Sequence, residues 1–203
     1  MLEWPSMIEA LPEAPLTSSA MLGPYRVADY RGLPDEPRVE LVYGRLLLVS
    51  SPVLRHQVAL MQLLERLRAT MRPLGCRVIM APMDVTLADH SIVQPDLLVV
   101  SPERKDIIGE RIEGAPDLLV EVLSPSTARL DRGDKLRLYA ESNVREYWLV
   151  DPAGLTIEFL VQREGRWLVA LPEDGVYASE AIEGLGLDLR DYWVAVDTEL
   201  AES

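Results

Sequence analysis

The sequence has little of what several classes of protein depend on. Its 203 residues include a single cysteine, Cys76, which excludes an internal disulfide and a cysteine-rich zinc site. No apolar run reaches the roughly 18 residues that a membrane-spanning helix needs. The first residues carry acids and prolines where a secretory signal has a basic flank and a continuous apolar core. We therefore expect a cytoplasmic protein with no membrane partner.

Two common catalytic motifs are also missing. The chain has no phosphate-binding glycine loop of the Walker type and no Gly-x-Ser-x-Gly, and Cys76 has no histidine near it in sequence. A P-loop enzyme and a nucleophilic hydrolase are therefore not indicated. Because His56 and His90 are the only histidines, any metal ion must be held mainly by carboxylates. This favours a hard cation, Mg²⁺ or Mn²⁺.

Basic residues are scarce, with 20 Lys and Arg against 33 Asp and Glu and a formal net charge of −13. This balance counts modestly against nucleic acid, because phosphate binding depends on Lys and Arg. Most of the excess lies in residues 146–203, which hold 13 acids and 3 bases. Residues 54–77 and 129–145 are locally basic; they are either solvated helix faces or a track for phosphates.

The spacing of apolar residues predicts one α/β domain over residues 24–203, preceded by an arm at 1–23. Apolar residues recur every three or four positions over 54–72, which indicates a helix that Pro73 and Gly75 end. The domain is expected to have a mixed central β-sheet flanked by helices, a core at 54–151, an appended C-terminal hairpin at 156–171 and an acidic tail. Further helices are predicted at 27–31 and 129–142, with a short segment at 192–196. Strands are predicted at 39–42, 45–50, 77–87 (interrupted by Pro82), 92–100, 117–123, 146–150, 156–162 and 167–171.

Two acids stand in strands that are otherwise apolar. Asp96 lies within residues 93–100 and Glu121 within residues 118–123. A carboxylate in such a run is costly to bury unless it is protonated or paired with a cation. Consecutive strands usually pair, so both carboxylates can project from one face, and two like charges that close favour a bound cation. The alternative is that hydrogen bonds or an arginine tie up both acids.

Asp117 is a second candidate, because it follows a proline just as Asp96 does. Asp117 and Glu121 share a strand face, but four residues separate them by roughly 13 Å. That distance is too long for both to bind one ion. Asp96 is therefore the better partner for Glu121.

Several segments resemble the PD-(D/E)xK, or restriction-endonuclease-like, superfamily, and more specifically its Uma-type family of restriction-endonuclease-like proteins. The resemblance covers about residues 25–170. The segments are VELVYGRL at 39–46, VQPDLLVV at 93–100, PDLLVEVLSPST at 116–127, DRGDKLRLY at 131–139 and VREYWLVDP at 144–152. One position departs from the superfamily pattern: Leu123 stands where the motif has lysine.

The resemblance implies a restriction-endonuclease-like fold and a site centred on Asp96 and Glu121. It implies that these two residues bind Mg²⁺ or Mn²⁺ together with the carbonyl of Val122. It also implies that Lys135, on the following helix, takes the part of the missing lysine. Asp131 precedes Lys135 by four residues, so the two share a helix face; the plainer interpretation is a surface ion pair.

The same resemblance places Glu40 at the edge of the site, although an exposed acid at a strand end is an equal alternative. His56 stands in the first turn of the helix at 54–72 and is a candidate to bind a phosphate or a water at the metal, or else an ordinary helix residue. The expected activity is metal-dependent hydrolysis of phosphodiester bonds in nucleic acid, with DNA as the expected partner. Two alternatives stay open: an inactive nuclease fold acting as a binding or scaffolding module, and a metal-dependent hydrolase of nucleotides or RNA. A homodimer is expected by analogy only.

Overall fold

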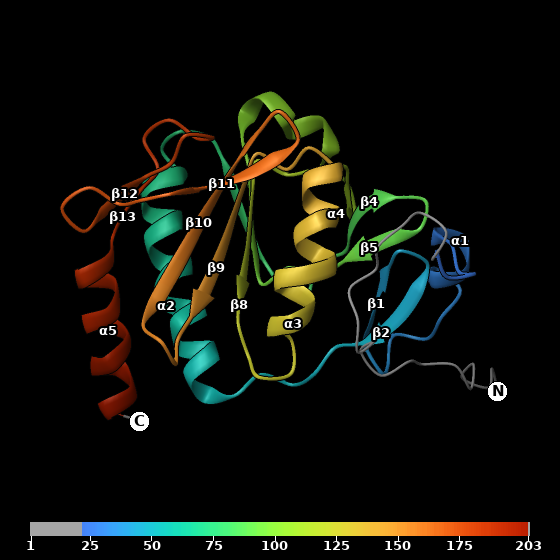
Figure 1. Ribbon diagram of the computed structural model, residues 1–203, viewed down its shortest axis with the longest axis horizontal. Helices are drawn as coiled ribbons and strands as arrows, with labels where there is room; N and C mark the ends of the chain where they lie inside the picture. Colours follow the sequence, from blue (N-terminus) through green and yellow to red (C-terminus); the bar gives the residue numbers. More distant parts are fainter. Residues whose placement is uncertain (1–21, 203) are drawn as a thin grey trace.

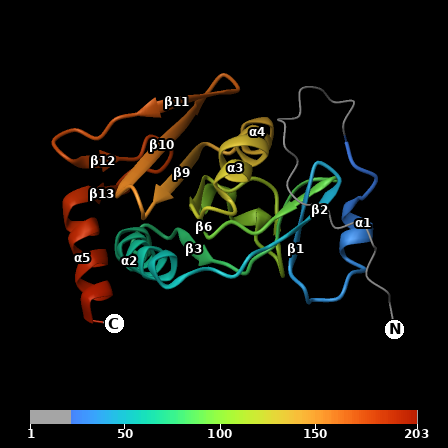
Figure 2. The ribbon, with the colours of Figure 1, turned by 60° about the horizontal axis from the view of Figure 1, so that its bottom comes forward.

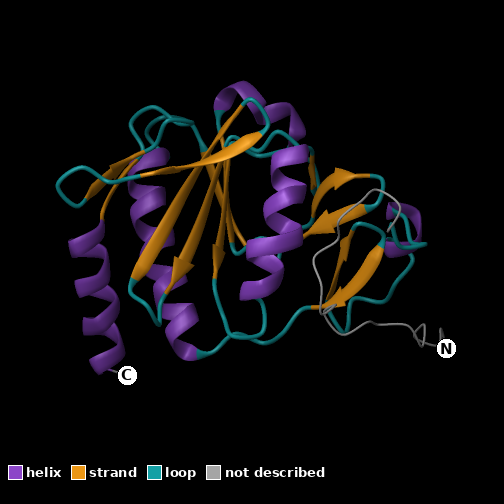
Figure 3. Cartoon of the chain, viewed as in Figure 1, coloured by secondary structure: helices purple, strands orange, loops and turns teal. Residues whose placement is uncertain are grey.

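The structure is a computed structural model that describes residues 22–202, so nearly all of the arm predicted at 1–23 lies outside the described residues. It has a six-stranded sheet, a five-stranded sheet and a two-stranded ribbon, with helices packed around the larger sheet (Figures 1 and 3). This is the mixed α/β architecture that the sequence predicts. No helix within residues 22–202 is long and apolar enough to cross a membrane.

The six-stranded sheet forms the centre of the molecule. Only β8 and β9 run parallel; every other neighbouring pair is antiparallel. In spatial order the strands are β11 (Arg166–Ala170), β10 (Thr156–Arg163), β9 (Glu146–Asp151), β8 (Leu118–Val122), β6 (Leu97–Val100) and β3 (Arg77–Met80). The predicted hairpin at 156–171 is therefore β10 and β11, and it extends this sheet instead of standing apart from it.

Alternating side chains give the sheet two apolar faces. Leu97, Leu118 and Val120 point to the face covered by helix α2 (Leu54–Met71), where they pack against Leu63 and Leu67. The intervening side chains of β6 and β8 point to the opposite face, which the helical crossover between β8 and β9 covers. Figure 2 shows these two helical layers on either side of the strands. Glu121 belongs to the second face, so its carboxylate meets the crossover.

The crossover is helical throughout but changes its winding where the site residues lie. It consists of α3 (Ala128–Leu130), a π-helical turn η3 (Asp131–Lys135) and α4 (Leu136–Glu141). Asn143 follows in the left-handed region, with φ 60°, as expected for a residue that closes a helix. Single π-helical turns are often found at functional sites, and this one contains both Asp131 and Lys135.

The segment predicted at 77–87 is interrupted at Pro82, as the sequence indicates, and the strand predicted at 92–100 is also broken in two, which corrects the sequence prediction. The two pieces of each segment belong to different sheets. β3 and β6 are part of the large sheet, whereas β4 (Val85–Ala88) and β5 (Ser91–Val93) are part of the five-stranded one. Pro82 and Pro95 stand at the two breaks, and a proline has no N–H to donate to a sheet.

The five-stranded sheet stands beside the large one and carries Glu40. A predicted hairpin forms its outer part, and β4 and β7 run parallel at its other edge. Its strands are, in order, β2 (Arg45–Leu48), β1 (Val39–Val42), β5, β4 and β7 (Ile112–Glu113). Helix α1 (Val27–Tyr30) packs beside this sheet, and the 3-10 helix η2 (Pro102–Ile107) follows β6.

The C-terminal region is more ordered than the predicted acidic tail. It forms the ribbon of β12 (Val176–Ala178) and β13 (Gly186–Asp188) and then helix α5 (Leu189–Glu202), which lies along α2 (Figure 1). Tyr192 and Val196, at the ends of the predicted short segment, are the buried residues of α5. The Tyr192 hydroxyl donates to the carbonyl of Ala59 on α2 at 3.0 Å.

Glu146 fastens this C-terminal region to the sheet. Its carboxylate is fully buried at the start of β9 and accepts hydrogen bonds from the Trp148 indole, the Tyr177 hydroxyl at 2.7 Å, the Ser179 hydroxyl at 2.6 Å and the Ala181 amide at 3.2 Å. Three of these donors belong to or border the ribbon. One carboxylate thus satisfies several buried donors at once.

Glu146→Ala is expected to lower the free energy of unfolding by about 3 kcal/mol, because it leaves buried donors without an acceptor. Urea denaturation measures this loss, and hydrogen exchange should show residues 176–188 losing protection first. Glu158→Ala, on the neighbouring strand β10, is the matched control: Glu158 is part-exposed, its one ion-pair partner within residues 22–202 is Arg132, and its removal should change stability by less than about 0.5 kcal/mol. Equal losses in the two variants would contradict the anchoring role.

Candidate active site

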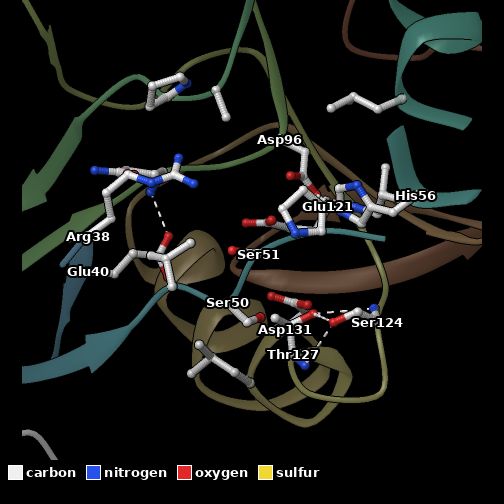
Figure 4. A pocket seen from close by; sticks show the side chains of 18 of the residues that line it. Arg38, Glu40, Ser50, Ser51, His56, Asp96, Glu121, Ser124, Thr127 and Asp131 are labelled. Carbon is white, nitrogen blue, oxygen red and sulfur yellow. Dashed lines mark hydrogen bonds and ion pairs between the residues drawn. The ribbon is translucent and has the colours of Figure 1, made fainter. Parts of the chain in front are cut away.

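A cavity of about 240 Å³ opens where the two sheets meet beneath the start of α2. Its walls come from β1, the connection from β2 to α2, the ends of β6 and β8, and the crossover. Figure 4 shows carboxylates from several of these elements pointing into it. All of the predicted site residues line this cavity: Glu40, His56, Asp96, Glu121, Val122 and Lys135.

Asp96 and Glu121 are brought together by the antiparallel pairing of β6 with β8. The last paired residues are Leu97 and Val120, so the next position outward sets Asp96 opposite Glu121. Asp96 Oδ2 accepts a hydrogen bond from the Val122 amide at 2.7 Å, which fixes its carboxylate at the end of β8. The strand pairing on which the sequence argument depends is therefore present.

Lys135 lies at the centre of three buried carboxylates. Its ammonium nitrogen is 2.9 Å from Glu121 Oε1, 3.0 Å from Glu40 Oε1 and 3.5 Å from Asp131 Oδ1. Its side chain is only 5 % exposed, so this is no surface ion pair. Tyr139, one turn further along the crossover, donates its hydroxyl to the same Glu121 oxygen at 2.7 Å. The crossover thus reaches the site through the side chain of Lys135, as the resemblance implies.

Burial and like charges oppose ionisation of the acids around Lys135. Burial raises the pKa of Glu121 well above its usual range, and the carboxylates of Asp131, Asp96 and Glu40 raise it further, while Lys135 opposes them. Burial likewise raises the pKa of Asp131 to about 6. Burial alone lowers the pKa of Lys135, but the three acids reverse this and raise it well above its usual value, so Lys135 stays charged.

His56 reaches Asp96 from the first turn of α2. Its Nε2 lies 3.3 Å from Asp96 Oδ2, and its side chain is 10 % exposed. The other ring nitrogen, Nδ1, is buried and has no hydrogen-bond partner within residues 22–202. His56 therefore has one nitrogen directed at a site carboxylate.

Asp117, the alternative acid, is occupied elsewhere. It is fully buried and accepts from the Ser101 amide at 2.7 Å and from Arg145 at 3.0 Å, with Arg104 at 3.4 Å. Asp117 precedes the start of β8, whereas Glu121 is near its end. Asp117 is thus held by hydrogen bonds and arginines, and its carboxylate does not point into the cavity of Asp96 and Glu121.

A family model described as "Uma2: Putative restriction endonuclease" matches residues 27–190. This chain belongs to the Uma2 family. A solved structure titled as a "putative nuclease belonging to DUF820" from Anabaena variabilis ATCC 29413 aligns with a TM-score of 0.73 over 85 % of this chain and 99 % of that one. At 20 % sequence identity, this match shows a shared fold.

A curated relative is similar over a shorter stretch. The "Uncharacterized protein slr1290" of Synechocystis sp. is 45 % identical over 56 residues, which are 27 % of this chain and 30 % of the relative. The chain therefore matches less than a third of that protein's length. The Uma2 family assignment depends on the family model alone, which covers most of the chain.

Sequence reasoning missed several residues at the site of this Uma2-family protein. Tyr139 does not line the cavity but bonds Glu121; it stands four residues after Lys135 on the same helical crossover, and that spacing could have indicated it. Arg38 lines the cavity, as do the hydroxyl side chains of Ser50, Ser51, Ser124 and Thr127. Residues 124–127 belong to the segment 116–127, which carries part of the family resemblance, and that membership was the sequence feature that could have indicated a role at the site.

The carboxylates fit a divalent ion bound by few protein ligands. No group of three or more His, Cys, Asp and Glu side chains within residues 22–202 is arranged to hold a metal ion. However, one oxygen of Asp96 and one of Glu121 make no hydrogen bond or ion pair with those residues, and both side chains line the cavity. Mg²⁺ commonly takes one or two carboxylates and completes its octahedron with water and substrate phosphate.

Lys135→Met is expected to lower the free energy of unfolding by about 3–5 kcal/mol, because it leaves three buried acids without their shared cation. Adding Glu121→Gln should recover part of that loss. Urea denaturation of the two single variants and the double variant gives the coupling energy, expected at about 1–3 kcal/mol. Additive effects, within about 0.5 kcal/mol, would show that the ammonium does not hold Glu121.

The raised pKa of Asp131 predicts a stability difference that depends on pH. Between its unfolded value near 3.8 and its folded value of about 6, the folded protein binds more protons than the unfolded chain, so Asp131 destabilises the fold as the pH rises through this window. Relative to Asp131→Asn, the wild type should lose up to about 3 kcal/mol between pH 4 and pH 7. Urea denaturation across this range measures the difference, and parallel profiles would refute the shift.

Proposed function

We propose that this protein is a metal-dependent endonuclease that hydrolyses phosphodiester bonds of nucleic acid, with DNA as its expected substrate. The observation that carries the proposal is the pair Asp96 and Glu121: each has one carboxylate oxygen without a partner among residues 22–202, in a cavity that Lys135 also lines. The family description, restriction endonuclease, supports the same class of reaction. Assembly as a homodimer stays a prediction.

Asp96 and Glu121 would hold Mg²⁺ or Mn²⁺, with the carbonyl of Val122 as a further ligand. Such an ion supplies positive charge to the attacked phosphate and lowers the pKa of water beside it. The hard oxygen donors of the pair suit these ions better than softer metals. The excess of carboxylates over cations in the cavity also favours a bound cation.

Side chains of the protein itself would position the phosphate and the water beside it. Lys135 holds Glu121 and Glu40 and would stabilise the negative charge that grows on the phosphate during attack. Glu40 Oε1 in turn accepts a hydrogen bond from the backbone N–H of Gln94 at 2.6 Å, which holds this β1 side chain at the site. His56, beside Asp96, would bind a phosphate oxygen or a water.

One further candidate function is a nuclease fold that binds without cutting. Two features favour it: Leu123 occupies the position of the motif lysine, and the net charge of −13 opposes phosphate binding. Against it stands Lys135, whose ammonium lies beside Glu121 although it comes from a different element. Cleavage assays separate the two candidates directly.

Purified protein, assayed on plasmid DNA, single-stranded DNA and RNA, is expected to cut DNA in Mg²⁺ or Mn²⁺ and to be inactive in EDTA. Asp96→Asn and Glu121→Gln should each lower the cleavage rate by about 100-fold or more, because each removes a ligand charge from the reacting centre. Asp106→Asn, an exposed acid on η2 outside the cavity, is the matched control and should cut like the wild type.

Circular dichroism of every variant separates loss of the site from loss of the fold. Absence of cutting by folded wild-type protein, or cutting that survives both site substitutions, would rule out the nuclease and favour the binding module. Cutting of RNA or nucleotides alone would assign the same site to a different hydrolase.

A further inference from the structure

A second cavity, of about 410 Å³, adjoins the first and has no assigned role. Arg38, Pro82 and Gln94 line both cavities and form the boundary between them. Its volume lies within the roughly 300–1,000 Å³ typical of small-molecule sites. Its remaining walls mix apolar and polar side chains from α1, the loop before β1, and the segment between β3 and β4. The two cavities therefore adjoin at the ends of the inner strands β1 and β5.

Arg38, at this boundary, is a cation whose guanidinium has no partner among residues 22–202. The two other arginines of the second cavity are paired, Arg31 with Glu113 at 2.6 Å and Arg111 with Asp84 at 3.2 Å. The half-buried Arg38 guanidinium makes no hydrogen bond or ion pair with any residue of 22–202. Figure 4 shows it on the Glu40 side of the first cavity, away from His56. An unpaired guanidinium is suited to bind a phosphate through two parallel hydrogen bonds.

Gln94 offers a buried acceptor at the same boundary. Its amide NH₂ donates to Asp84 Oδ1 at 2.9 Å and to the Tyr30 hydroxyl at 3.2 Å, and because a carboxylate only accepts, this contact fixes which end of the amide carries the oxygen. That oxygen is buried and has no partner among residues 22–202. A buried acceptor of this kind is satisfied by an N–H donor, such as those on the pairing edge of a nucleobase.

The charge of the second cavity fits a base better than a second phosphate. Exposed acids Asp35, Glu36 and Glu110 stand along its lining, and they repel a phosphate but accept hydrogen bonds from base amino groups. Apolar side chains such as Leu33 and Met83 provide contacts for a flat ring. A phosphate at Arg38 and a base beyond it would thus occupy neighbouring parts of one groove.

We infer, on the basis of the proposed nuclease function, that the two cavities form one groove for an unpaired nucleotide of single-stranded nucleic acid: Arg38 binds the phosphate next to the carboxylates, and Gln94 reads the base in the second cavity. A base inside a duplex has its pairing edge occupied, so this groove takes single strands or frayed ends. The few unpaired cations at the cavities also suit recognition of one nucleotide better than a long duplex track.

The test measures binding apart from cleavage. The probe is a fluorescein-labelled single-stranded DNA decamer, with Ca²⁺ in place of Mg²⁺, and fluorescence anisotropy gives its affinity against a blunt hairpin duplex of the same sequence. The single strand should bind at least about 10-fold more tightly. Arg38→Gln should weaken single-strand binding about 10-fold, while Arg166→Gln, which removes an exposed arginine on β11 outside both cavities, should leave it unchanged.

Base reading is tested with decamers that each carry one abasic nucleotide. In the wild type, one abasic position should weaken binding about 5- to 10-fold; in Gln94→Leu, intact and abasic decamers should bind alike. A merely structural role of Gln94 would lower stability without removing this position dependence. Equal binding of duplex and single strand, or equal effects of Arg38→Gln and Arg166→Gln, would overturn the inference. Binding that follows these expectations without any cleavage in Mg²⁺ would support the groove while refuting the nuclease.

Discussion

The ammonium of Lys135 is the contact on which the site depends. It joins one carboxylate from each of three elements: Glu40 on β1, Glu121 on β8 and Asp131 on the crossover. These acids are too deeply buried and too close to ionise together without a cation among them. Because Glu40 belongs to the five-stranded sheet and Glu121 to the six-stranded sheet, the same ammonium also links the two sheets. The ion pairs of Lys135 therefore balance the charges of the buried acids and at the same time hold the two sheets together.

The position of Leu123 explains how this lysine comes from a helix. Leu123 follows Glu121 by two residues, and its side chain packs in the apolar cluster beneath the crossover. A lysine there would require its own charge to be solvated or paired within that cluster. The π-helical turn instead directs Lys135 and Asp131 from the crossover toward Glu121. An ammonium thus lies beside the same acid although it comes from another element, and the apolar face of the sheet stays intact.

The sequence allowed prediction of elements with strong periodicity and of the acids that break it. The helix at 54–72 and the antiparallel pairing that sets Asp96 opposite Glu121 follow from local patterns, and both are present. The interruption at Pro82 was predicted, but the passage of the chain from one sheet to the other at Pro82 and Pro95 was not, because a proline interrupts a strand without indicating which sheet the chain joins next. Helix α5 was missed because only Tyr192 and Val196 are fully buried, and the acids at 191, 197, 199 and 202 interrupt the apolar pattern. The spacing of Tyr139 from Lys135 places both on one side of the crossover, but only the tertiary contacts show that the Tyr139 hydroxyl bonds Glu121.

The free-energy cost of burying these charged groups helps to choose between a nuclease and a scaffolding module. Replacing a buried ion cluster by apolar residues is often neutral or stabilising, so a scaffolding module gains no stability from three acids around one lysine. Here the cluster opens into a cavity with two unbonded carboxylate oxygens, an unpaired guanidinium at Arg38 and an unsatisfied amide oxygen at Gln94. Each of these groups is more stable with a partner that residues 22–202 do not supply. A cation, a phosphate and a base donor together satisfy all of them, and a nucleotide bound with a divalent metal ion brings all three.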